Sequence, residues 1–182
     1  CISQNGFDHL SQRSGRKEIA DLSRMGTFDH GLSPFPQGET FRIVSCSSSH
    51  PVKRLPLIFE LLKHTSHKIH WTHIGAGDIR DDLGKWAAVL PANVSTHFPG
   101  NLANPDLMQL YQTEAFDAFV NVSASEGIPV SIMEAISFGI PIMATHVGGV
   151  KEIVTEEVGI MIPGDFEPKE AIEALEKLLE EK

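Results

Sequence analysis

Two glutamates in the second half of the chain have the type and spacing of a ligand-binding pair. Glu126 and Glu134 are separated by seven residues within SASEGIPVSIMEAISFG. We expect the first in a loop after a strand and the second about one turn into the next helix, so both face one crevice. The backbone N–H groups between them lie at a helix N-terminus, which favours an anion such as a diphosphate. Since Pro129 has no N–H, the candidate donors are Gly127, Ile128, Val130 and Ser131.

The roles of the two carboxylates follow from the expected anion. A carboxylate beside a phosphate is repelled unless hydroxyl groups lie nearby from which it accepts hydrogen bonds. Glu134 therefore fits a ribose diol, and Glu126 fits the hydroxyls of a sugar. Taken alone, a glutamate such as Glu134 is more often an ordinary exposed helix residue. The flanking motif reverses that preference.

Further candidates follow the first three expected strands. Lys53, in VSCSSSHPVKRL, stands at a helix start where an anion can bind. The loop HIGAGD contains Gly75 and Gly77, which permit close backbone approach. This loop lacks the third glycine and the following acid of a dinucleotide fingerprint, which sets NAD binding aside. The loop HFPGNL contributes Pro99 and Gly100 to the same crevice.

The elements that position these residues alternate between β-rich and amphipathic segments. Strands are expected at 41–46, 68–75, 91–98, 115–123, 140–145 and 158–163, and helices at 53–64, 78–90, 104–113, 130–139 and 168–182. Asp78 and Asn104 are the expected caps of the second and third helices. The pattern predicts an α/β fold, a doubly wound parallel six-stranded Rossmann-like sheet. Such sheets bind ligands at the carboxyl ends of their strands.

The chain before Phe41 does not fit this pattern. CISQNGFDHLSQ is typical of a strand end and a helix, and GTFDHGLSPFPQGE is rich in Gly and Pro like a linker. We place a boundary near Gly38, with residues 1–38 as the remnant of a preceding domain and its linker and 39–182 as the ligand-binding domain. The chain begins with Cys rather than Met, so we expect it to derive from a longer polypeptide.

Composition narrows the classes of partner. The chain has 182 residues, with 15 basic and 24 acidic residues and a formal charge of -9, which disfavours nucleic acid. Cys1 and Cys46 lie far apart without metal or redox motifs, as in a reducing compartment. Four histidines recur at every third position from His64 to His73 but cannot share one face, so no metal is expected. With no apolar run of about 18 to 20 residues, we expect a cytoplasmic protein, with peripheral membrane association of the full-length protein left open.

The motif EGIPVSIMEA, followed by a strand and HVGGVKEIV, resembles the donor-site signature of the glycogen-synthase-like retaining GT-B glycosyltransferases, glycosyl transferases group 1. The resemblance runs from about Phe41 to the end and implies the C-terminal half of a GT-B fold. It implies that Glu126 contacts the transferred sugar, Glu134 the ribose, and the turn between them the sugar and diphosphate. The family places the base at the HFPGNL loop.

The first-strand loop departs from the family in one position. Lys53 occupies the place of the family's diphosphate-binding lysine, but Ser48 stands where an arginine is usual. Arg54 and His50 are the candidates to replace that arginine. The effect of Ser48 on phosphate binding stays open at this point.

The resemblance implies the donor-binding half of a glycosyltransferase that moves a sugar from a nucleotide diphosphate donor to an acceptor with retention and without a divalent ion. The acceptor, a glycan or lipid-linked sugar in a polysaccharide pathway, would be bound by the missing N-terminal domain, and this half alone would be inactive. A non-catalytic nucleotide-sugar-binding module is the main alternative, and a nucleotide-sugar epimerase is a more distant one.

Overall fold

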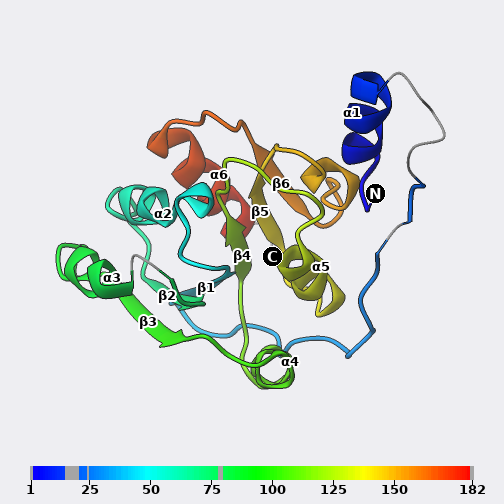
Figure 1. Cartoon of the computed structure of the whole chain (residues 1–182). Helices are drawn as coiled ribbons and strands as arrows, with labels where there is room; N and C mark the ends of the chain where they lie inside the picture. Colours follow the sequence, from blue (N-terminus) through cyan, green and yellow to red (C-terminus); the bar gives the residue numbers. More distant parts are fainter. Residues whose placement is uncertain (1, 15–20, 24, 78–79, 181–182) are drawn as a thin grey trace.

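Six short strands form one parallel sheet at the centre of the protein (Figure 1). The computed structural model describes residues 2–14, 21–23, 25–77 and 80–180. The strand order along the sheet is β3-β2-β1-β4-β5-β6. The strands are β1 (Phe41–Cys46), β2 (Ile69–Ile74), β3 (Val94–Gly100), β4 (Ala118–Asn121), β5 (Ile142–Thr145) and β6 (Gly159–Ile162). This is the doubly wound arrangement that the alternating sequence pattern predicted, and the strand order reverses between β1 and β4.

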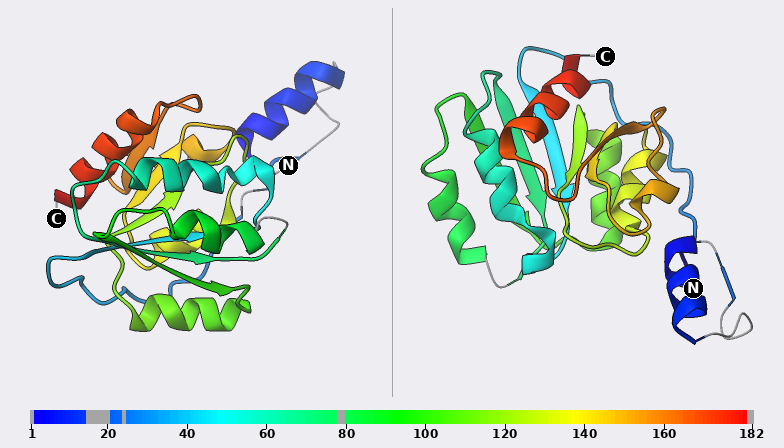
Figure 2. Two further views of the ribbon diagram at one scale, coloured as in Figure 1. Left: turned by 90° about the vertical axis from the view of Figure 1, so that its left-hand side faces the viewer. Right: turned by 90° about the horizontal axis from the view of Figure 1, so that it is seen from above.

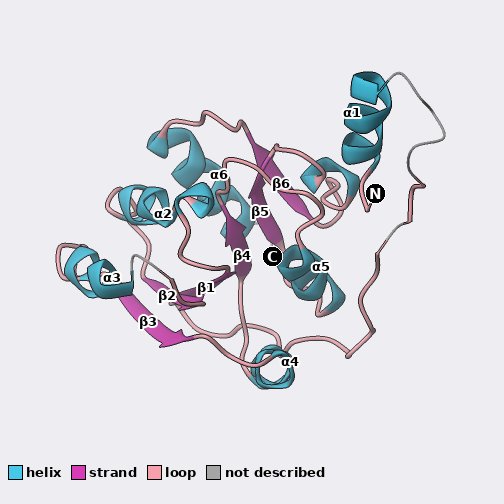
Figure 3. Ribbon diagram, viewed as in Figure 1, coloured by secondary structure: helices cyan, strands magenta, loops and turns pink. Residues whose placement is uncertain are grey.

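Helices cover both faces of the sheet (Figure 3). One face carries α2 (Leu55–Leu62), α3 (Arg80–Ala87) and α6 (Pro168–Glu180), and the other carries α4 (Asn104–Thr113) and α5 (Val130–Ser137). Two single-turn 3₁₀ helices, η1 (Pro51–Lys53) and η2 (Val150–Glu152), follow β1 and β5. The predicted helices and strands are therefore present, with ends that differ by a few residues.

The two layers of core follow the two-residue period of the strands. In β1, Ile43 packs into the layer beneath α2 and α6, whereas its neighbour Val44 packs into the layer beneath α4 and α5. Met143 and Ala144 of β5 divide in the same way, and all four side chains are buried. Burial on both faces explains the consecutive apolar residues at the centres of these strands, such as Ile43 and Val44.

One expected helix cap is different in the structure. The residue at the N-cap of α4 is Ala103, with extended backbone and no side-chain cap, and Asn104 is already the first helical residue. Pro105 then occupies the first turn, where its missing N–H is not needed. The prediction that Asn104 caps α4 is wrong, because the Asn104 side chain bonds to a residue of another helix, α5. The other expected cap, Asp78, lies outside the described residues.

A first helix, α1 (Gln4–Ser14), projects away from the sheet (Figure 2). Its first turn is capped by the Glu152 carboxylate, which accepts from the N–H groups of Gln4 at 2.8 Å and Asn5 at 3.0 Å. The segment 25–40 then returns along α4 and α5, where the Ser33 N–H donates to the Phe138 carbonyl oxygen at 2.9 Å. In the part of the chain that the structure describes, none of the helices is long and apolar enough to cross a bilayer.

Arg54 joins η1 to α2 and connects three segments of the domain. It has a left-handed backbone, with φ of 50°, and its guanidinium donates to the carbonyl oxygens of Val122 and Gly164 at 2.7 Å each and of Ser123 at 3.2 Å. The guanidinium also lies over the Phe166 ring, 5.4 Å from its centroid. Arg54 thus ties the segment after β1 to the segments after β4 and β6.

Replacing Arg54 with alanine should lower the free energy of unfolding by about 2 kcal/mol, because carbonyl groups in the interior lose a charged donor. Urea unfolding followed by circular dichroism measures this change. Lys63→Ala is the matched control, since Lys63 makes one exposed ion pair with Glu60, and we expect a change below about 0.5 kcal/mol. Equal effects of the two substitutions would contradict the role given to Arg54.

Candidate functional site

The carboxyl ends of β1 and β4 meet where the strand order reverses. Lys53 ends the 3₁₀ helix after β1, and Glu126 lies in the loop after β4. The Lys53 Nζ atom lies 2.7 Å from Glu126 Oε1, and the Ala124 N–H donates to the Val52 carbonyl oxygen at 2.8 Å. The two loops are therefore joined by a backbone hydrogen bond and by an ion pair at the position where doubly wound sheets bind ligands.

Glu126 is held as a charged group in a mostly buried position. Its side chain is 8% exposed, and Oε1 also accepts from Asn121 Nδ2 at 3.2 Å. Burial by itself raises the pKa of the Glu126 carboxyl, but hydrogen bonds from Lys53, Ser123 and Asn121 outweigh it and hold the pKa below its usual value. Asn121 was not singled out from the sequence, where it reads as one more residue of a buried strand.

A crevice of about 410 Å³ opens beside this ion pair. Most of its wall comes from the segments after β1 and β4 and the first turn of α5. Its lining residues are Cys46, Ser47, Ser48, Lys53, Ile74, Gly75, Asn101, Leu102, Glu126, Ile128, Pro129, Val130 and Ser131. The expected residues Lys53, Gly75, Glu126, Ile128, Pro129, Val130 and Ser131 are therefore brought together.

The N-terminus of α5 supplies the polar end of the crevice. Pro129 is the N-cap, and its carbonyl oxygen accepts from the N–H groups of Ile132 and Met133 at 3.1 and 3.3 Å. The N–H groups of Val130 and Ser131 precede these first helical bonds, so they are available to an acceptor outside the helix. Lys53 lies at the same crevice. An ammonium group and a helix N-terminus together form an environment for an anion.

Glycines after β2 and β5 let the surrounding loops pack closely. Gly75 has φ of 145°, and a Cβ atom there would lie 1.8 Å from the Ser47 carbonyl oxygen. Gly148 has φ of 52°, and a Cβ atom would lie 1.8 Å from the Glu126 carbonyl oxygen. These contacts fix the backbone of the crevice wall. Gly77 packs against Ser49 and does not line the crevice.

Three other predicted residues lie beside the crevice rather than in its lining. The carbonyl oxygen of Gly127 accepts from the Gly149 N–H at 3.0 Å, so this glycine faces the loop after β5. Pro99 and Gly100 end β3, and the Gly100 carbonyl oxygen accepts from the Gly75 N–H at 2.8 Å. Asn101 and Leu102, the next two residues, line the crevice in their place. Contact of Pro99 and Gly100 with the base of a nucleotide stays a prediction.

Glu134 lies in α5, one turn beyond Ser131, and does not reach the crevice lining. It is 9% exposed, and its Oε1 accepts from Asn104 Nδ2 at 2.8 Å. Burial raises the pKa of the Glu134 carboxyl above its usual value, and the Asn104 hydrogen bond and the nearby His30 only partly counter it. The two glutamates of the motif therefore differ: Glu126 has a cation as its partner, and Glu134 has an amide.

Neither residue considered as a replacement for the missing family arginine lines the crevice. The Arg54 guanidinium is already bonded to three carbonyl oxygens. The His50 Nδ1 accepts from the Val52 N–H at 3.3 Å as the cap of η1. Ser48 itself lines the crevice with Lys53. Among the crevice-lining residues of the first loop, Lys53 is thus the one cation.

Three of the four evenly spaced histidines have separate partners, and that of His73 is Ser45, whose Oγ atom lies 2.9 Å from its Nδ1 atom. His67 lies 3.6 Å from Glu180 through its Nε2 atom, and His70 Nδ1 pairs with Ser95 Oγ at 2.8 Å. His73 is buried, and burial lowers its pKa to about 4. Among the described residues, no three His, Cys, Asp or Glu side chains are grouped to hold a metal ion. The expectation of metal independence stays a prediction.

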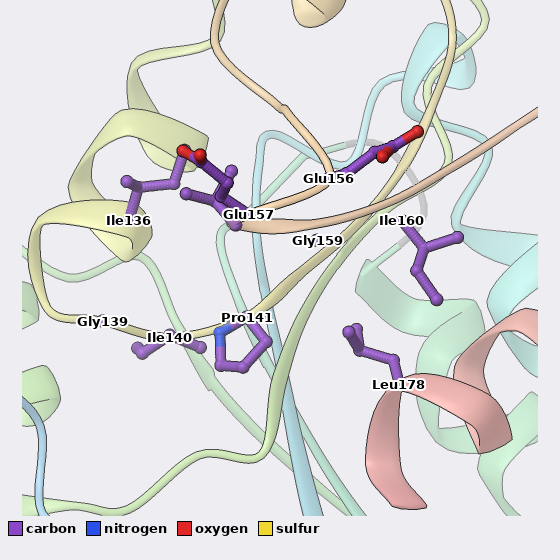
Figure 4. Close-up of a pocket in the computed structure, with 10 residues that line it drawn as sticks. Ile136, Gly139, Ile140, Pro141, Glu156, Glu157, Gly159, Ile160 and Leu178 are labelled. Carbon is purple, nitrogen blue, oxygen red and sulfur yellow. The ribbon is translucent and has the colours of Figure 1, made fainter. Parts of the chain in front are cut away.

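Another hollow, of about 300 Å³, lies at the opposite end of the strands from the crevice (Figure 4). It is formed before β5 and at the start of β6, with Ile136, Ile140, Pro141, Glu157 and Leu178 among its lining residues. These are the amino ends of the strands. The hollow contains none of the residues that the sequence motif singled out.

Comparison with known proteins identifies the family of this chain. Residues 34–182 match the family described as glycosyl transferases group 1. The chain belongs to this family. One similar protein is the sulfoquinovosyl transferase SQD2 from Arabidopsis thaliana, which is 34% identical over 116 residues, or 59% of this chain and 22% of that protein.

Solved glycosyltransferase structures share the fold. The lipopolysaccharide outer core galactosyltransferase WaaB superposes with a TM-score of 0.83 at 18% identity, over 100% of this chain and 52% of that chain. HepE from Anabaena, in complex with UDP-glucose, superposes with a TM-score of 0.79 at 22% identity, over 100% and 53%. The chain thus spans about half the length of these GT-B enzymes and less than a quarter of SQD2. The predicted Rossmann-like, GT-B type of fold is confirmed.

The Lys53–Glu126 pair should make stability depend on pH in the acid range. Because the folded-state pKa of Glu126 lies below the ordinary 4.5, the pair stabilises the protein fully above that value and ceases to do so as pH falls through the folded pKa. We expect Glu126→Gln to cost about 1 kcal/mol at pH 7 and much less at pH 3. Urea unfolding between these pH values measures the difference.

Glu60→Gln is the control for this prediction, because Glu60 is 48% exposed in its pair with Lys63. Its effect should stay near zero at every pH. A Glu126→Gln effect that did not change between pH 7 and pH 3 would show that the carboxylate charge contributes nothing.

Proposed function

We propose that this chain is the donor-binding half of a retaining glycosyltransferase that transfers a sugar from a nucleoside diphosphate sugar to an acceptor without a divalent metal ion. The observation that carries the proposal is the position of Lys53, which faces Glu126 across the reversal of strand order and shares a crevice with the first turn of α5. A cation and a helix N-terminus suit a diphosphate, and carboxylates suit hydroxyl groups.

Lys53 would exchange one anion for another when a donor binds. In the structure its ammonium group pairs with the Glu126 carboxylate, with Nζ 2.7 Å from Oε1. A diphosphate carries more charge, so Lys53 would bond to it, and Glu126 would become free to accept from the hydroxyls of the transferred sugar. This exchange would connect occupancy of the diphosphate position with orientation of the sugar.

Catalysis would then depend on positioning and charge stabilisation. As the bond from the anomeric carbon to the diphosphate breaks, negative charge grows on the leaving oxygen. Lys53 and the N–H groups of Val130 and Ser131 would stabilise that charge, which is the work a metal ion does in other transferases. Glu134 would hold the ribose and keep the leaving group in place.

The acceptor, a glycan or a lipid-linked sugar, would be bound by an N-terminal domain beyond this half. The fold match covers about half of WaaB and HepE, which supports a second domain of similar size in the complete protein. A role in polysaccharide synthesis is consistent with the fold match to WaaB, a lipopolysaccharide outer core galactosyltransferase. We expect this half by itself to bind a donor weakly and to catalyse no transfer.

Binding of a nucleotide should raise the melting temperature, because a ligand that binds only the folded state stabilises it by about 2.7 kcal/mol at 100 times its Kd. UDP, GDP and ADP are compared on the chain and on the complete protein, each with and without EDTA. We expect one of the three to give a shift that EDTA does not change. Lys53→Ala should lower the affinity for that nucleotide at least tenfold, because a charged partner of the diphosphate is lost.

Lys63→Ala controls for a general loss of positive charge and should leave the shift unchanged. A shift that disappears with EDTA would contradict metal independence, and no shift in the complete protein would contradict donor binding. Sugar transfer by the complete protein separates the enzyme from a non-catalytic nucleotide-sugar-binding module.

A further inference from the structure

Asn104 contacts Glu134 from the neighbouring helix on the same face of the sheet. It is the first residue of α4, and its Nδ2 atom donates to Glu134 Oε1 in α5 at 2.8 Å. The N-cap position expected for Asn104 is filled by Ala103, which makes no side-chain cap bond. The asparagine side chain is therefore committed to Glu134, 30 residues away in the sequence.

The other groups near Glu134 make no hydrogen bond to its carboxylate in the part of the chain that the structure describes. His30, from the segment 25–40, attracts it but stacks on the Phe138 ring, with centroids 5.6 Å apart. Burial raises the pKa of the Cys46 thiol in β1 to about 11, so that group is neutral. Burial also raises the pKa of the Tyr111 phenol in α4, so it is neutral as well.

The carboxylate has one oxygen fixed and one available. Among the described residues, the hydrogen bond from Asn104 is the one found on the Glu134 side chain, and it is made to Oε1. A carboxylate accepts through both oxygens. A single amide donor therefore sets the orientation of the group and leaves Oε2 for a hydroxyl.

We propose that Asn104 is a positioning residue for nucleotide binding, which fixes Glu134 through Oε1 so that Oε2 accepts from a ribose hydroxyl. This inference rests on the proposed function, because it requires Glu134 to contact ribose. Asn104 itself acts through Glu134 and needs no contact with the ligand. Removing it should thus weaken the ribose contact without affecting the rest of the nucleotide.

The experiment compares UDP with 2′-deoxy-UDP and 3′-deoxy-UDP by calorimetry on the wild-type protein, Asn104→Ala and Glu134→Ala. We expect the wild-type protein to prefer UDP over at least one deoxy analogue. Asn104→Ala should lower the affinity for UDP about five- to tenfold, as the loss of one hydrogen bond would. It should leave the affinity for that analogue nearly unchanged. Glu134→Ala should abolish the preference. Gln109→Ala, an exposed amide in the same helix, is the control and should change neither.

The variant Asn104→Asp gives a pH-dependent readout that would not change if Asn104 had only a general structural role. It places a second carboxylate against Glu134. Because two adjacent negative charges repel, the pKa of the pair is raised, and at low pH the two carboxylates share one proton. Near pH 8 both are charged and UDP affinity should fall well below that of Asn104→Ala. Near pH 5 the shared proton restores a donor to Oε1, and the affinity should recover towards that of the wild-type protein.

The outcomes separate this inference from the function on which it rests. If Glu134→Ala abolishes the preference for UDP while Asn104→Ala leaves it intact, Asn104 has no positioning role and the donor site stands. If the wild-type protein binds UDP but prefers it over neither analogue, the ribose assignment of Glu134 fails, and this inference fails with it. If neither UDP, GDP nor ADP binds to the complete protein, the proposed function is overturned as well.

Discussion

The ion pair between Lys53 and Glu126 is the interaction around which the rest of the site is arranged. Its two members are 73 residues apart, and they meet because β1 and β4 are neighbours where the strand order reverses. Behind Lys53, the guanidinium of Arg54 ties the same segment to three backbone carbonyl oxygens. Behind Glu126, Gly148 allows the loop after β5 to press against its backbone. The fold thus supplies support on both sides of one salt bridge.

The two glutamates of the motif lie in different environments, which fits the different roles proposed for them. Glu126 is kept charged by a cation, whereas Glu134 is buried with an amide as its partner, and burial raises its pKa. A ligand anion could replace Glu126 at Lys53, whereas the hydrogen-bond partner of Glu134 is the neutral amide of Asn104. Under the proposed function, the first position would respond to the diphosphate, and the second would suit a neutral hydroxyl. This distinction depends on partners from other segments and not on the spacing of the motif.

The fold and most of the crevice could be predicted because their signals are local. Strand and helix periodicity fixed the elements within a few residues, and the motif around Glu126 marked the loop that lines the crevice. What escaped prediction depends on long-range contacts. Asn104 has the sequence context of a helix cap, and Arg54 that of a spare phosphate ligand, but both side chains bond across the fold. Gly77 packs on Ser49 outside the crevice lining, and its contact with a ligand stays a prediction.

A crystal structure of the protein with UDP bound tests the central claim most directly. The account predicts that Lys53 Nζ has left Glu126 and lies within hydrogen-bond distance of a diphosphate oxygen, with the N–H groups of Val130 and Ser131 on the same anion. The ribose should lie against Glu134. UDP bound away from the crevice, or a diphosphate in the crevice with Lys53 still paired to Glu126, would contradict it.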